Sequence, residues 1–204
     1  MRVISGSCKG RRLIPPVGTD IRPTPDKVKG ALFNIIGECV IGSSFLDLFA
    51  GTGAVGIEAL SRGAREVVFV DKSIRAIETV KGNLRVCNLE KDSMIQGVRG
   101  ASKNPQTHEP SKPKILILKG DAVEIIKKFK TGQFDFIFLD PPYKSDLGEK
   151  ALKEISRYNI LKEGGEAILE HYYKNIPDPS SGWVGELKLR RTIRYGDTAL
   201  SFFC

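Results

Sequence analysis

Short, continuously apolar segments alternate with amphipathic ones through most of the chain. The apolar segments have the length and residue types of buried strands, and they lie at Phe45–Leu48, Val67–Val70, Ile115–Leu118, Phe136–Leu139 and Ala167–Leu169. Between them, apolar residues recur at helical spacing in segments 54–61, 74–84, 122–129 and 147–158. Strands that alternate with helices predict a mostly parallel sheet that is covered by helices on both faces.

The two ends of the chain predict additions to this core. Arg2–Ile14 alternates short apolar groups with glycines, which indicates a small β-hairpin. Thr24 and Pro25 are of the types preferred at a helix N-cap and at the first helical position, so we expect a helix to begin there. At the other end, Glu186–Tyr195 and Thr198–Phe203 flank a Gly-Asp pair and predict an antiparallel hairpin.

Residues 92–113 interrupt the alternation of strands and helices. This segment is rich in Gly, Ser, Lys, Asn and Pro and has few large apolar side chains, so it can bury little surface. We expect a flexible surface insertion; a nucleic-acid-binding role is the alternative. No internal repeat or linker divides the chain, which predicts a single domain over residues 1–204.

Composition limits the class of protein. The chain has 204 residues, 41% hydrophobic and 27% charged, as in ordinary globular domains. No apolar run approaches the roughly 18–20 residues of a membrane span, and the N-terminus lacks the apolar stretch of a secretory signal. The four cysteines are widely spaced without a CxxC pair, and there are two histidines. We therefore expect a cytoplasmic protein without a metal site or membrane attachment.

The net charge of +8 is concentrated near the N-terminus. Residues 1–30 hold seven basic side chains against two acidic ones, a net charge of +5. A nucleic acid is a suitable partner for such a segment, because each phosphate that is neutralised releases condensed counterions. A basic surface that serves only solubility would have the same charge.

A glycine-rich turn follows the first predicted strand. Gly51, Gly53 and Gly56 form a G-x-G-x-x-G pattern, which permits close approach of a ligand to the backbone. The ligand could be the pyrophosphate of a dinucleotide or the ribose and methionine part of S-adenosylmethionine, and the glycines could also serve only a tight turn. Asp47, at the end of the strand, favours S-adenosylmethionine, because its carboxylate suits an α-ammonium group and would repel a pyrophosphate.

Two further carboxylates follow the next two strands. Asp71 ends the second strand, where a carboxylate can accept hydrogen bonds from both ribose hydroxyls. This role is common to nicotinamide and methyl-donor cofactors, so Asp71 indicates a nucleoside without choosing between them. Asp121 follows the third strand and could accept a hydrogen bond from an adenine amino group, cap the next helix, or do both.

The strongest chemical signal is the tetrapeptide Asp140-Pro141-Pro142-Tyr143, which follows an apolar strand. An exocyclic amine of a base is a poor nucleophile because its lone pair is delocalised into the ring. Hydrogen bonds from its N–H groups to the Asp140 carboxylate and the Pro141 carbonyl can localise that lone pair. The prolines hold these acceptors in place, and Tyr143 offers a face on which an extruded base can stack. A plain Pro-Pro turn is the alternative interpretation.

The chain resembles the bacterial family of 16S rRNA guanine-N2 methyltransferases. Four stretches carry the resemblance: Val3–Gly6 with Lys9–Arg11; Arg22–Thr24 through Leu32–Asn34; Asp47–Gly56 with Glu58–Gly63; and Asp140–Tyr143. The similarity covers the chain from its first residues to the terminal hairpin, apart from segment 92–113.

This resemblance implies a fold, a cofactor and a set of site residues. The implied fold is α/β and Rossmann-like, of the class I methyltransferase type: a seven-stranded, mostly parallel sheet with a C-terminal antiparallel hairpin and an N-terminal hairpin–helix extension. The implied methyl donor is S-adenosylmethionine. The catalytic residues are Asp140, Pro141, Pro142 and Tyr143. The cofactor-binding residues are Thr24, Asp47, Phe49, Ala50, Gly51, Gly53, Asp71, Lys72, Asp121 and Ala122. RNA contacts are expected from the extension 1–37, at Lys9, Arg11, Arg12, Arg22 and Lys27.

Three functions are consistent with these features. The first is methylation of a guanine N2 amine in small-subunit rRNA, as free RNA or in a ribosomal particle, by a monomeric enzyme; the choice of guanine N2 rests on the resemblance. The second is methylation of adenine N6 in DNA, since the same tetrapeptide occurs in such enzymes, although the chain has no evident separate target-recognition domain. The third is an NAD-binding oxidoreductase or a non-catalytic nucleotide-binding module.

Overall fold

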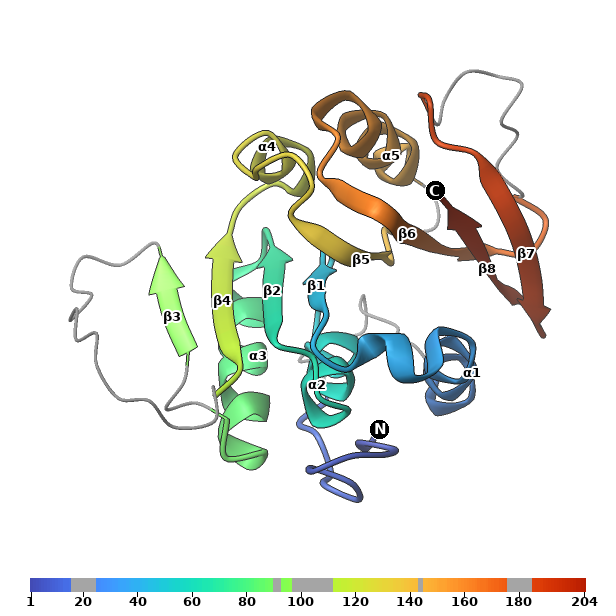
Figure 1. Cartoon of the computed structure of the whole chain (residues 1–204). Helices are drawn as coiled ribbons and strands as arrows, with labels where there is room; N and C mark the ends of the chain where they lie inside the picture. The colour runs from blue at the N-terminus through green and yellow to red at the C-terminus, as the bar shows by residue number, and fades with distance from the viewer. Residues whose placement is uncertain (16–24, 90–92, 97–111, 143–144, 176–184) are drawn as a thin grey trace.

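A twisted eight-stranded sheet forms the centre of the protein, with the strand order β3-β4-β2-β1-β5-β6-β8-β7 (Figure 1). The computed structural model describes residues 1–15, 25–89, 93–96, 112–142, 145–175 and 185–204. The strands are β1 (Ser44–Asp47), β2 (Glu66–Asp71), β3 (Ser93–Gln96), β4 (Lys114–Lys119), β5 (Phe134–Leu139), β6 (Leu161–Tyr172), β7 (Leu189–Tyr195) and β8 (Thr198–Phe203).

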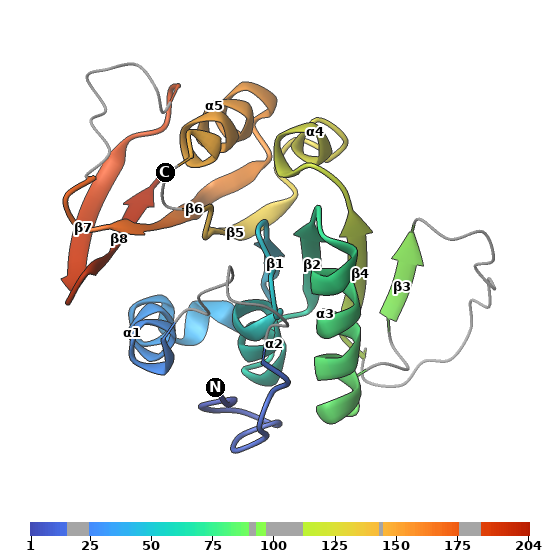
Figure 2. The same ribbon diagram turned by 180° about the vertical axis from the view of Figure 1, so that it is seen from behind.

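Helices cover both faces of the sheet, as the sequence predicts (Figures 1 and 2). They are α1 (Asp26–Ile36), the 3-10 turn η1 (Gly37–Val40), α2 (Ala54–Ser61), α3 (Ile74–Val86), α4 (Ala122–Ile126) and α5 (Leu147–Tyr158). Alternate residues of each strand point to opposite faces. Phe45 of β1 therefore packs in a core with α1, α2 and α3, and Leu46 packs in a second core with α4 and α5.

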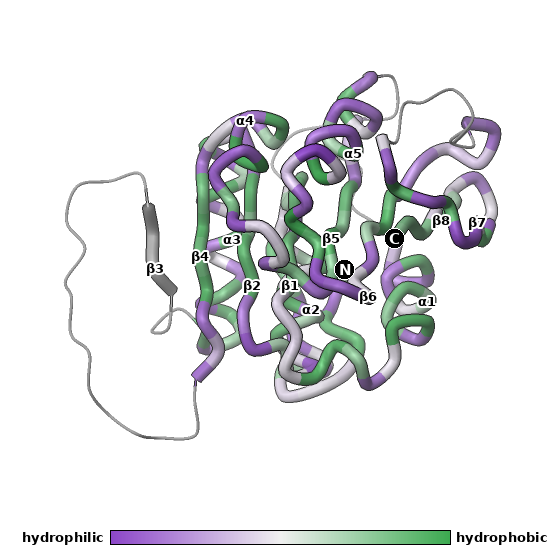
Figure 3. Tube along the Cα trace, turned by 45° about the horizontal axis from the view of Figure 1, so that its top comes forward, coloured by the Kyte–Doolittle hydropathy of each residue, from purple (hydrophilic) through white to green (hydrophobic). Residues whose placement is uncertain are grey.

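The sheet is parallel from β3 to β6. β1 pairs in parallel with β2 on one side and with β5 on the other, and all three strands are coloured mainly as hydrophobic in Figure 3. The C-terminal hairpin of β7 and β8 adds to β6, with β8 antiparallel to both neighbours. The predicted α/β architecture and the terminal antiparallel hairpin are thus confirmed.

The structure corrects the predicted elements in three places. The sheet has eight strands rather than seven, because Ser93–Gln96, inside the predicted insertion 92–113, pairs with β4 as the edge strand β3; residues 97–111 lie outside the described part of the chain. α1 begins at Asp26 with Pro25 as its N-cap, so Pro25 is not the first helical residue. The helix predicted over 122–129 ends at Ile126 and continues as a turn.

The N-terminal hairpin is small but firmly attached. Its strands meet in one bridge, Arg2 with Arg12. The fully buried carboxylate of Glu58 in α2 accepts hydrogen bonds from the backbone N–H groups of Ile4 (2.8 Å) and Ser5 (2.9 Å). The buried Lys29 of α1 lies 3.3 Å from the same carboxylate and donates to the Arg2 carbonyl at 2.6 Å. The Glu58 carboxylate therefore joins both the hairpin and α1 to α2.

Adding a methyl group at two helical glycines should change the free energy of unfolding in opposite directions. A Cβ at Gly30 in α1 would lie 3.5 Å from Ile4 Cδ1, an ordinary contact, whereas a Cβ at Gly56 in α2 would lie 2.3 Å from Phe69 Cε1. We expect Gly30→Ala to raise the free energy of unfolding by about 0.5–1 kcal/mol, because alanine loses less backbone entropy in a helix. We expect Gly56→Ala to lower it by about 1–3 kcal/mol through overpacking.

Urea denaturation of the two variants and the parent protein measures these effects. A lower midpoint for Gly30→Ala would show that α1 cannot accept a methyl group beside Ile4. An unchanged midpoint for Gly56→Ala would show that α2 can move away from β2 at little cost.

Candidate active site

The carboxyl ends of five adjacent strands bring acidic residues to one edge of the sheet. Along the order β4-β2-β1-β5-β6 the strands are parallel, and the first four end at or just before Asp121, Asp71, Asp47 and Asp140. In β6, Glu170 directly follows Leu169, the last residue that pairs with β5. Ligands of open α/β sheets bind at this edge. The structure thus collects the carboxylates that were predicted to bind the cofactor and the start of the predicted catalytic loop on the same side of the molecule.

The glycine-rich turn between β1 and α2 depends on all three of its glycines. Gly51 and Gly53 have φ values of 52° and 74°, in the left-handed region that side chains disfavour. Gly56 faces β2 so closely that any side chain would collide with Phe69. The Ala50 N–H donates to the Val70 carbonyl at 2.9 Å, which fixes the turn to the neighbouring strand.

Asp47 is a buried carboxylate beneath this turn. Its side chain accepts a hydrogen bond from the Gly56 N–H in the first turn of α2 at 3.0 Å, and the residue is 2% exposed. Burial raises the pKa of Asp47 to about 7 against the opposing effect of that hydrogen bond, and the nearby Asp71 raises it further. A cationic group of a ligand at this edge would favour the ionised form of Asp47.

Asp71 and Asp121 each have a structural role at the end of a strand. Asp71 accepts from the Gly51 N–H at 2.9 Å and from the Ser73 N–H at 2.8 Å, one bond on each oxygen. Asp121 caps α4 through Oδ1, which accepts from Val123 N–H at 2.9 Å and Glu124 N–H at 3.3 Å. The capping role predicted for Asp121 is confirmed. Each carboxylate retains acceptor capacity, because an ionised carboxylate has about four lone-pair sites.

The other predicted cofactor-binding residues flank these carboxylates. Phe49 and Ala50 belong to the glycine-rich turn, Lys72 is exposed directly after Asp71, and Ala122 is the buried first residue of α4. The structure thus places them at the carboxyl ends of β1, β2 and β4. Thr24 lies outside the described residues.

The predicted catalytic loop leaves β5 beside the glycine-rich turn. The Leu48 N–H donates to the Phe138 carbonyl at 3.0 Å and joins the two segments. Asp140 is half-buried, Pro141 is buried and Pro142 is exposed. The Pro142 carbonyl accepts from the Ser145 N–H (3.0 Å) and hydroxyl (2.7 Å), so the loop turns directly towards α5. Tyr143 lies outside the described residues.

A cavity of about 140 Å³ adjoins this loop. Pro141 and Pro142 form one wall, the first turn of α5 forms another, and Glu170, His171 and Tyr172 at the end of β6 close it. His171 shares hydrogen bonds with the Tyr172 carbonyl through Nδ1 (2.9 Å) and with the Ser201 hydroxyl through Nε2 (2.8 Å). Since a carbonyl can only accept, Nδ1 carries the proton. Burial lowers the pKa of His171, so the neutral ring is favoured at neutral pH.

Sequence reasoning missed a buried amide that supports the glycine-rich turn. Asn83 of α3 is fully buried; its Nδ2 donates to the carbonyls of Thr52 (2.8 Å) and Ile14 (3.2 Å), and its Oδ1 accepts from the Ile14 N–H at 2.6 Å. It therefore ties the end of the N-terminal hairpin to the turn. The available signal was a polar residue beside Val80 and Leu84 in the apolar stripe of a helix.

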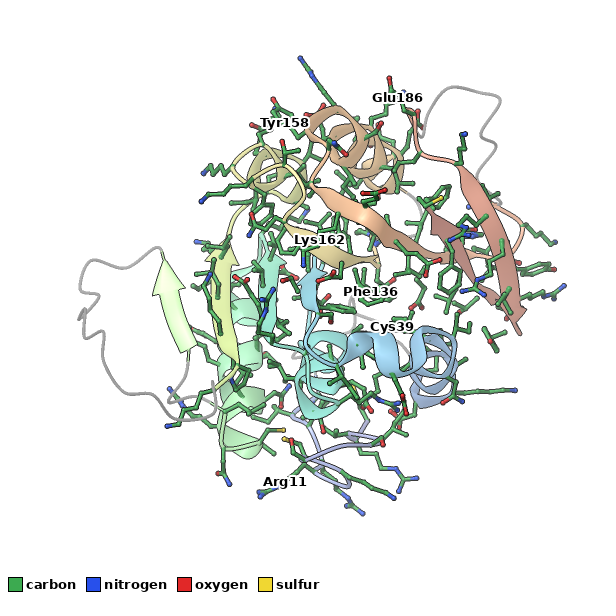
Figure 4. The ribbon with its side chains drawn as sticks, viewed as in Figure 1. Arg11, Cys39, Phe136, Tyr158, Lys162 and Glu186 are labelled. Carbon is green, nitrogen blue, oxygen red and sulfur yellow. The ribbon has the colours of Figure 1, made fainter. Side chains whose placement is uncertain are left out.

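The structure does not bring the basic hairpin to the catalytic loop. The hairpin packs on the C-terminal ends of α2 and α3: the Ser7 N–H donates to the Ser61 carbonyl at 2.8 Å, and Arg11 Nη1 donates to the Val86 carbonyl at 3.0 Å. These helix ends lie at the amino edge of the sheet, opposite to the catalytic loop. Arg11 projects from the bottom of the molecule in Figure 4. Lys9, Arg11, Arg12 and Lys27 are exposed, and Arg22 lies outside the described residues.

No group of three or more His, Cys, Asp or Glu side chains is arranged to hold a metal ion within the described residues. In the same residues, no helix combines the length and apolarity needed to cross a membrane.

The pKa of Asp47 predicts a pH-dependent cost of stability. An unfolded Asp47 ionises near its ordinary pKa of 3.8, whereas the folded residue holds its proton until about pH 7. The contribution of Asp47 to the free energy of unfolding therefore falls between pH 4 and pH 7. We expect Asp47→Asn to match the parent protein near pH 4 and to exceed it by about 1–4 kcal/mol at pH 8.

Urea denaturation at pH 4, 6 and 8 measures the difference. Asp146→Asn is the control, because the exposed Asp146 lies beside Lys150, which lowers its pKa, so its removal should cost stability at pH 8 rather than add to it. A difference between Asp47→Asn and the parent that is constant with pH would show that folding does not shift the pKa of Asp47.

The comparisons with known proteins agree with this geometry. A family profile described as "Conserved hypothetical protein 95" matches residues 1–204. "Putative rRNA methyltransferase YlbH" of Bacillus subtilis is 40% identical over 203 residues, which cover 100% of this chain and 98% of that protein. "Ribosomal RNA small subunit methyltransferase D" of Haemophilus influenzae is 32% identical over 171 residues, 83% of this chain and 78% of the relative. Among solved structures, "Putative methyltransferase yhhF" of Escherichia coli has a TM-score of 0.73 and is 22% identical in sequence. The match covers 100% of this chain and 96% of that chain, and it supports the fold. The chain therefore belongs to the family of ribosomal RNA small subunit methyltransferase D proteins that this profile describes.

Proposed function

We propose that this protein transfers a methyl group from S-adenosylmethionine to the exocyclic N2 amine of a guanine in small-subunit rRNA. The observation that carries the proposal is that the parallel pairing of β1 with β5 brings the glycine-rich turn and the Asp140 loop to one sheet edge, where the Leu48 N–H donates to the Phe138 carbonyl of β5. The relatives are named as rRNA methyltransferases, in one case of the small subunit. The choice of guanine N2 rests on the resemblance of the sequence motifs.

The side chains at this edge suit the methyl donor. Its ammonium group, ribose hydroxyls and adenine amine are all hydrogen-bond donors, and Asp47, Asp71 and Asp121 are acceptors at the ends of three adjacent strands. A dinucleotide would instead place a pyrophosphate above the buried Asp47, where like charges repel. This argues against the NAD-binding alternative.

Asp140 and the carbonyl of Pro141 would act on the target amine. Bound S-adenosylmethionine supplies a methyl group that is already activated by its sulfonium. Asp140 and Pro141 accept hydrogen bonds from the two N–H groups, which localises the nitrogen lone pair and directs it at the methyl carbon. As the new C–N bond formed, the bond between the methyl carbon and the sulfonium sulfur would break and S-adenosylhomocysteine would leave; the nitrogen would then lose a proton, which the Asp140 carboxylate could accept. The buried ring of Pro141 keeps both acceptors in place.

Adenine N6 in DNA is the second candidate. Its amine is also delocalised into an aromatic ring and could use the same two acceptors. The family of the relatives favours rRNA, and the identity of the methylated nucleoside decides between the two.

Methyl transfer to undermethylated small-subunit RNA and to small-subunit particles tests the proposal. Mass analysis of the nucleosides should find N2-methylguanosine as the product, in free RNA or in particles; N6-methyladenine would overturn the choice of guanine.

Asp140→Ala should lower kcat by about 10²–10³-fold, because it removes an acceptor that acts in the transition state. The variant should leave the Kd for S-adenosylmethionine nearly unchanged. Glu163→Gln, exposed near the start of β6, is the control and should behave like the parent enzyme. Equal losses of cofactor binding and turnover in Asp140→Ala would assign Asp140 a structural role.

The basic hairpin predicts a salt-dependent contribution to RNA binding. Arg11→Glu with Arg12→Glu should weaken binding and reduce the slope of log Kd against log salt by about 2 or more, since two phosphate contacts are lost. Binding isotherms at several salt concentrations measure the slope. An unchanged slope would place the RNA away from the hairpin.

A further inference from the structure

The cavity beside Pro141 and Pro142 is lined by three acidic residues, Asp146, Glu149 and Glu170, and by no lysine or arginine of the described chain. Lys150 and Lys153 pair with Asp146 and Glu149 and compensate their charges, so they are not free to bind a phosphate. The basic hairpin supplies no cation here, since it docks at the opposite edge of the sheet. A nucleotide strand at the catalytic loop therefore needs separate contacts on this edge.

An arginine–tyrosine cluster next to the cavity has the chemistry for such contacts. Arg194, at the end of β7, places its Cζ 3.5 Å from the ring centroid of Tyr173. The Tyr172 and Tyr173 rings lie 4.9 Å apart at 61°, and Lys174 Nζ is 5.7 Å from the Tyr173 centroid. We call Tyr172, Tyr173, Lys174 and Arg194 the Arg194–Tyr173 platform.

Strand pairing places the platform at the catalytic edge. Leu139, directly before Asp140, pairs with Leu169 of β6, so the residues that follow Leu169 extend alongside the catalytic loop. Further along β6, Tyr172 pairs with Thr198, which also pairs with Tyr195. The Tyr173 N–H donates to the Asp197 carbonyl at 3.0 Å, which holds the β7–β8 turn against the end of β6. Tyr172 lines the same cavity as Pro141.

Arg194 is oriented for a ligand rather than for an internal ion pair. Its Nε donates to the Gly196 carbonyl at 2.7 Å, and one face of the guanidinium rests on Tyr173, while the side chain remains exposed. Within the described residues no carboxylate forms a salt bridge with it, whereas Arg190 and Arg191 on the same strand both pair with Glu166. The outer face of Arg194 can stack on a base, and its terminal N–H groups can bind a phosphate.

We propose that the Arg194–Tyr173 platform binds a single-stranded nucleotide of the RNA that flanks the methylated base. This rests on the proposed function and adds a second RNA-contacting surface to it. Exposed cationic side chains beside half-buried aromatic rings favour RNA over a protein partner with an apolar contact surface. The exposed large hydrophobic residues of the described chain are Ile14, Ile41 and Ile74, none of which lies in β6, β7 or the turns that follow them.

Arg194→Ala and Tyr173→Leu test the platform, and the chain contains a matched control. Arg157 lies over Tyr158 with its Cζ 5.8 Å from the ring centroid, at the C-terminal end of α5 and so at the opposite edge (Tyr158 is labelled in Figure 4). Arg157→Ala and Tyr158→Leu remove the same chemical groups away from the site.

The measurements are Kd for a single-stranded RNA of about 12 nucleotides, the salt dependence of Kd, and kcat and KM for methyl transfer. Arg194→Ala and Tyr173→Leu should each raise Kd and KM about ten-fold with kcat within about two-fold of the parent. Arg194→Ala should also reduce the salt slope by about 1, whereas Tyr173→Leu should not. The two control variants should match the parent enzyme, and unchanged S-adenosylmethionine binding should confirm that all four variants are folded.

Two results would overturn the proposal that the platform binds RNA. One is that Kd and KM are unchanged in both test variants. The other is a loss of kcat alone, which would mean that the cluster only supports the catalytic loop. An equal loss in the Arg157 and Tyr158 variants would show a nonspecific effect and would count against it too. If the parent protein methylates no RNA, the proposed function fails, but RNA Kd values measured without methyl transfer still decide whether the platform binds the strand.

Discussion

The parallel pairing of β1 with β2 and β5 is the constraint on which the site depends. A central strand with parallel neighbours on both sides sends each chain segment to the same edge before the chain returns through a helix. The glycine-rich turn after β1 and the loop after β5 consequently meet there, although they lie about ninety residues apart in the sequence. The hydrogen bond from the Leu48 N–H to the Phe138 carbonyl of β5 extends the pairing one residue beyond β1, just before the two segments begin.

The same edge concentrates negative charge in a way that favours function over stability. Asp47 is buried beneath a helix N-terminus, whose dipole and Gly56 N–H offset only part of the cost of desolvation. A hydrophobic side chain at this position would avoid that cost, but it could not bind a cationic ligand. The structure thus contains a carboxylate that the fold does not need and that the proposed cofactor does.

Local chemistry made much of the site predictable from the sequence. The glycines of the turn and the Pro-Pro pair after Asp140 restrict the backbone in ways that are visible in a few adjacent residues, and the proposed roles of Asp140 and Pro141 follow from the same short stretch. Asn83, His171 and Glu58 were not predicted as site or anchoring residues, because each acts through partners distant in the sequence: Ile14 and Thr52, Ser201, and Ile4 and Ser5. A single sequence gives no signal for such pairings.

The position of the N-terminal hairpin shows a second limit of the same kind. Alternating residues and glycines predicted that a hairpin forms, which is local information. Whether it docks at the amino or the carboxyl edge depends on Ser61, Glu58 and Val86, which belong to two different helices. Similarly, β3 exists because β4 offers a free edge, and four residues in a segment of low hydrophobicity carry little strand signal of their own.

The separation of hairpin and catalytic loop has a mechanical consequence for the proposed function. A contact at one edge can position a base at the other only if the connection between the edges is stiff. The Glu58 carboxylate supplies that connection, because it joins the hairpin backbone to α2 and, through Lys29, to α1, all in the interior. A buried ion pair adds little net stability, since desolvation offsets most of its Coulomb energy, but breaking it leaves an uncompensated charge. It therefore helps to hold the hairpin in one orientation, so that RNA bound at the hairpin, as proposed, would approach the Asp140 loop from a defined direction.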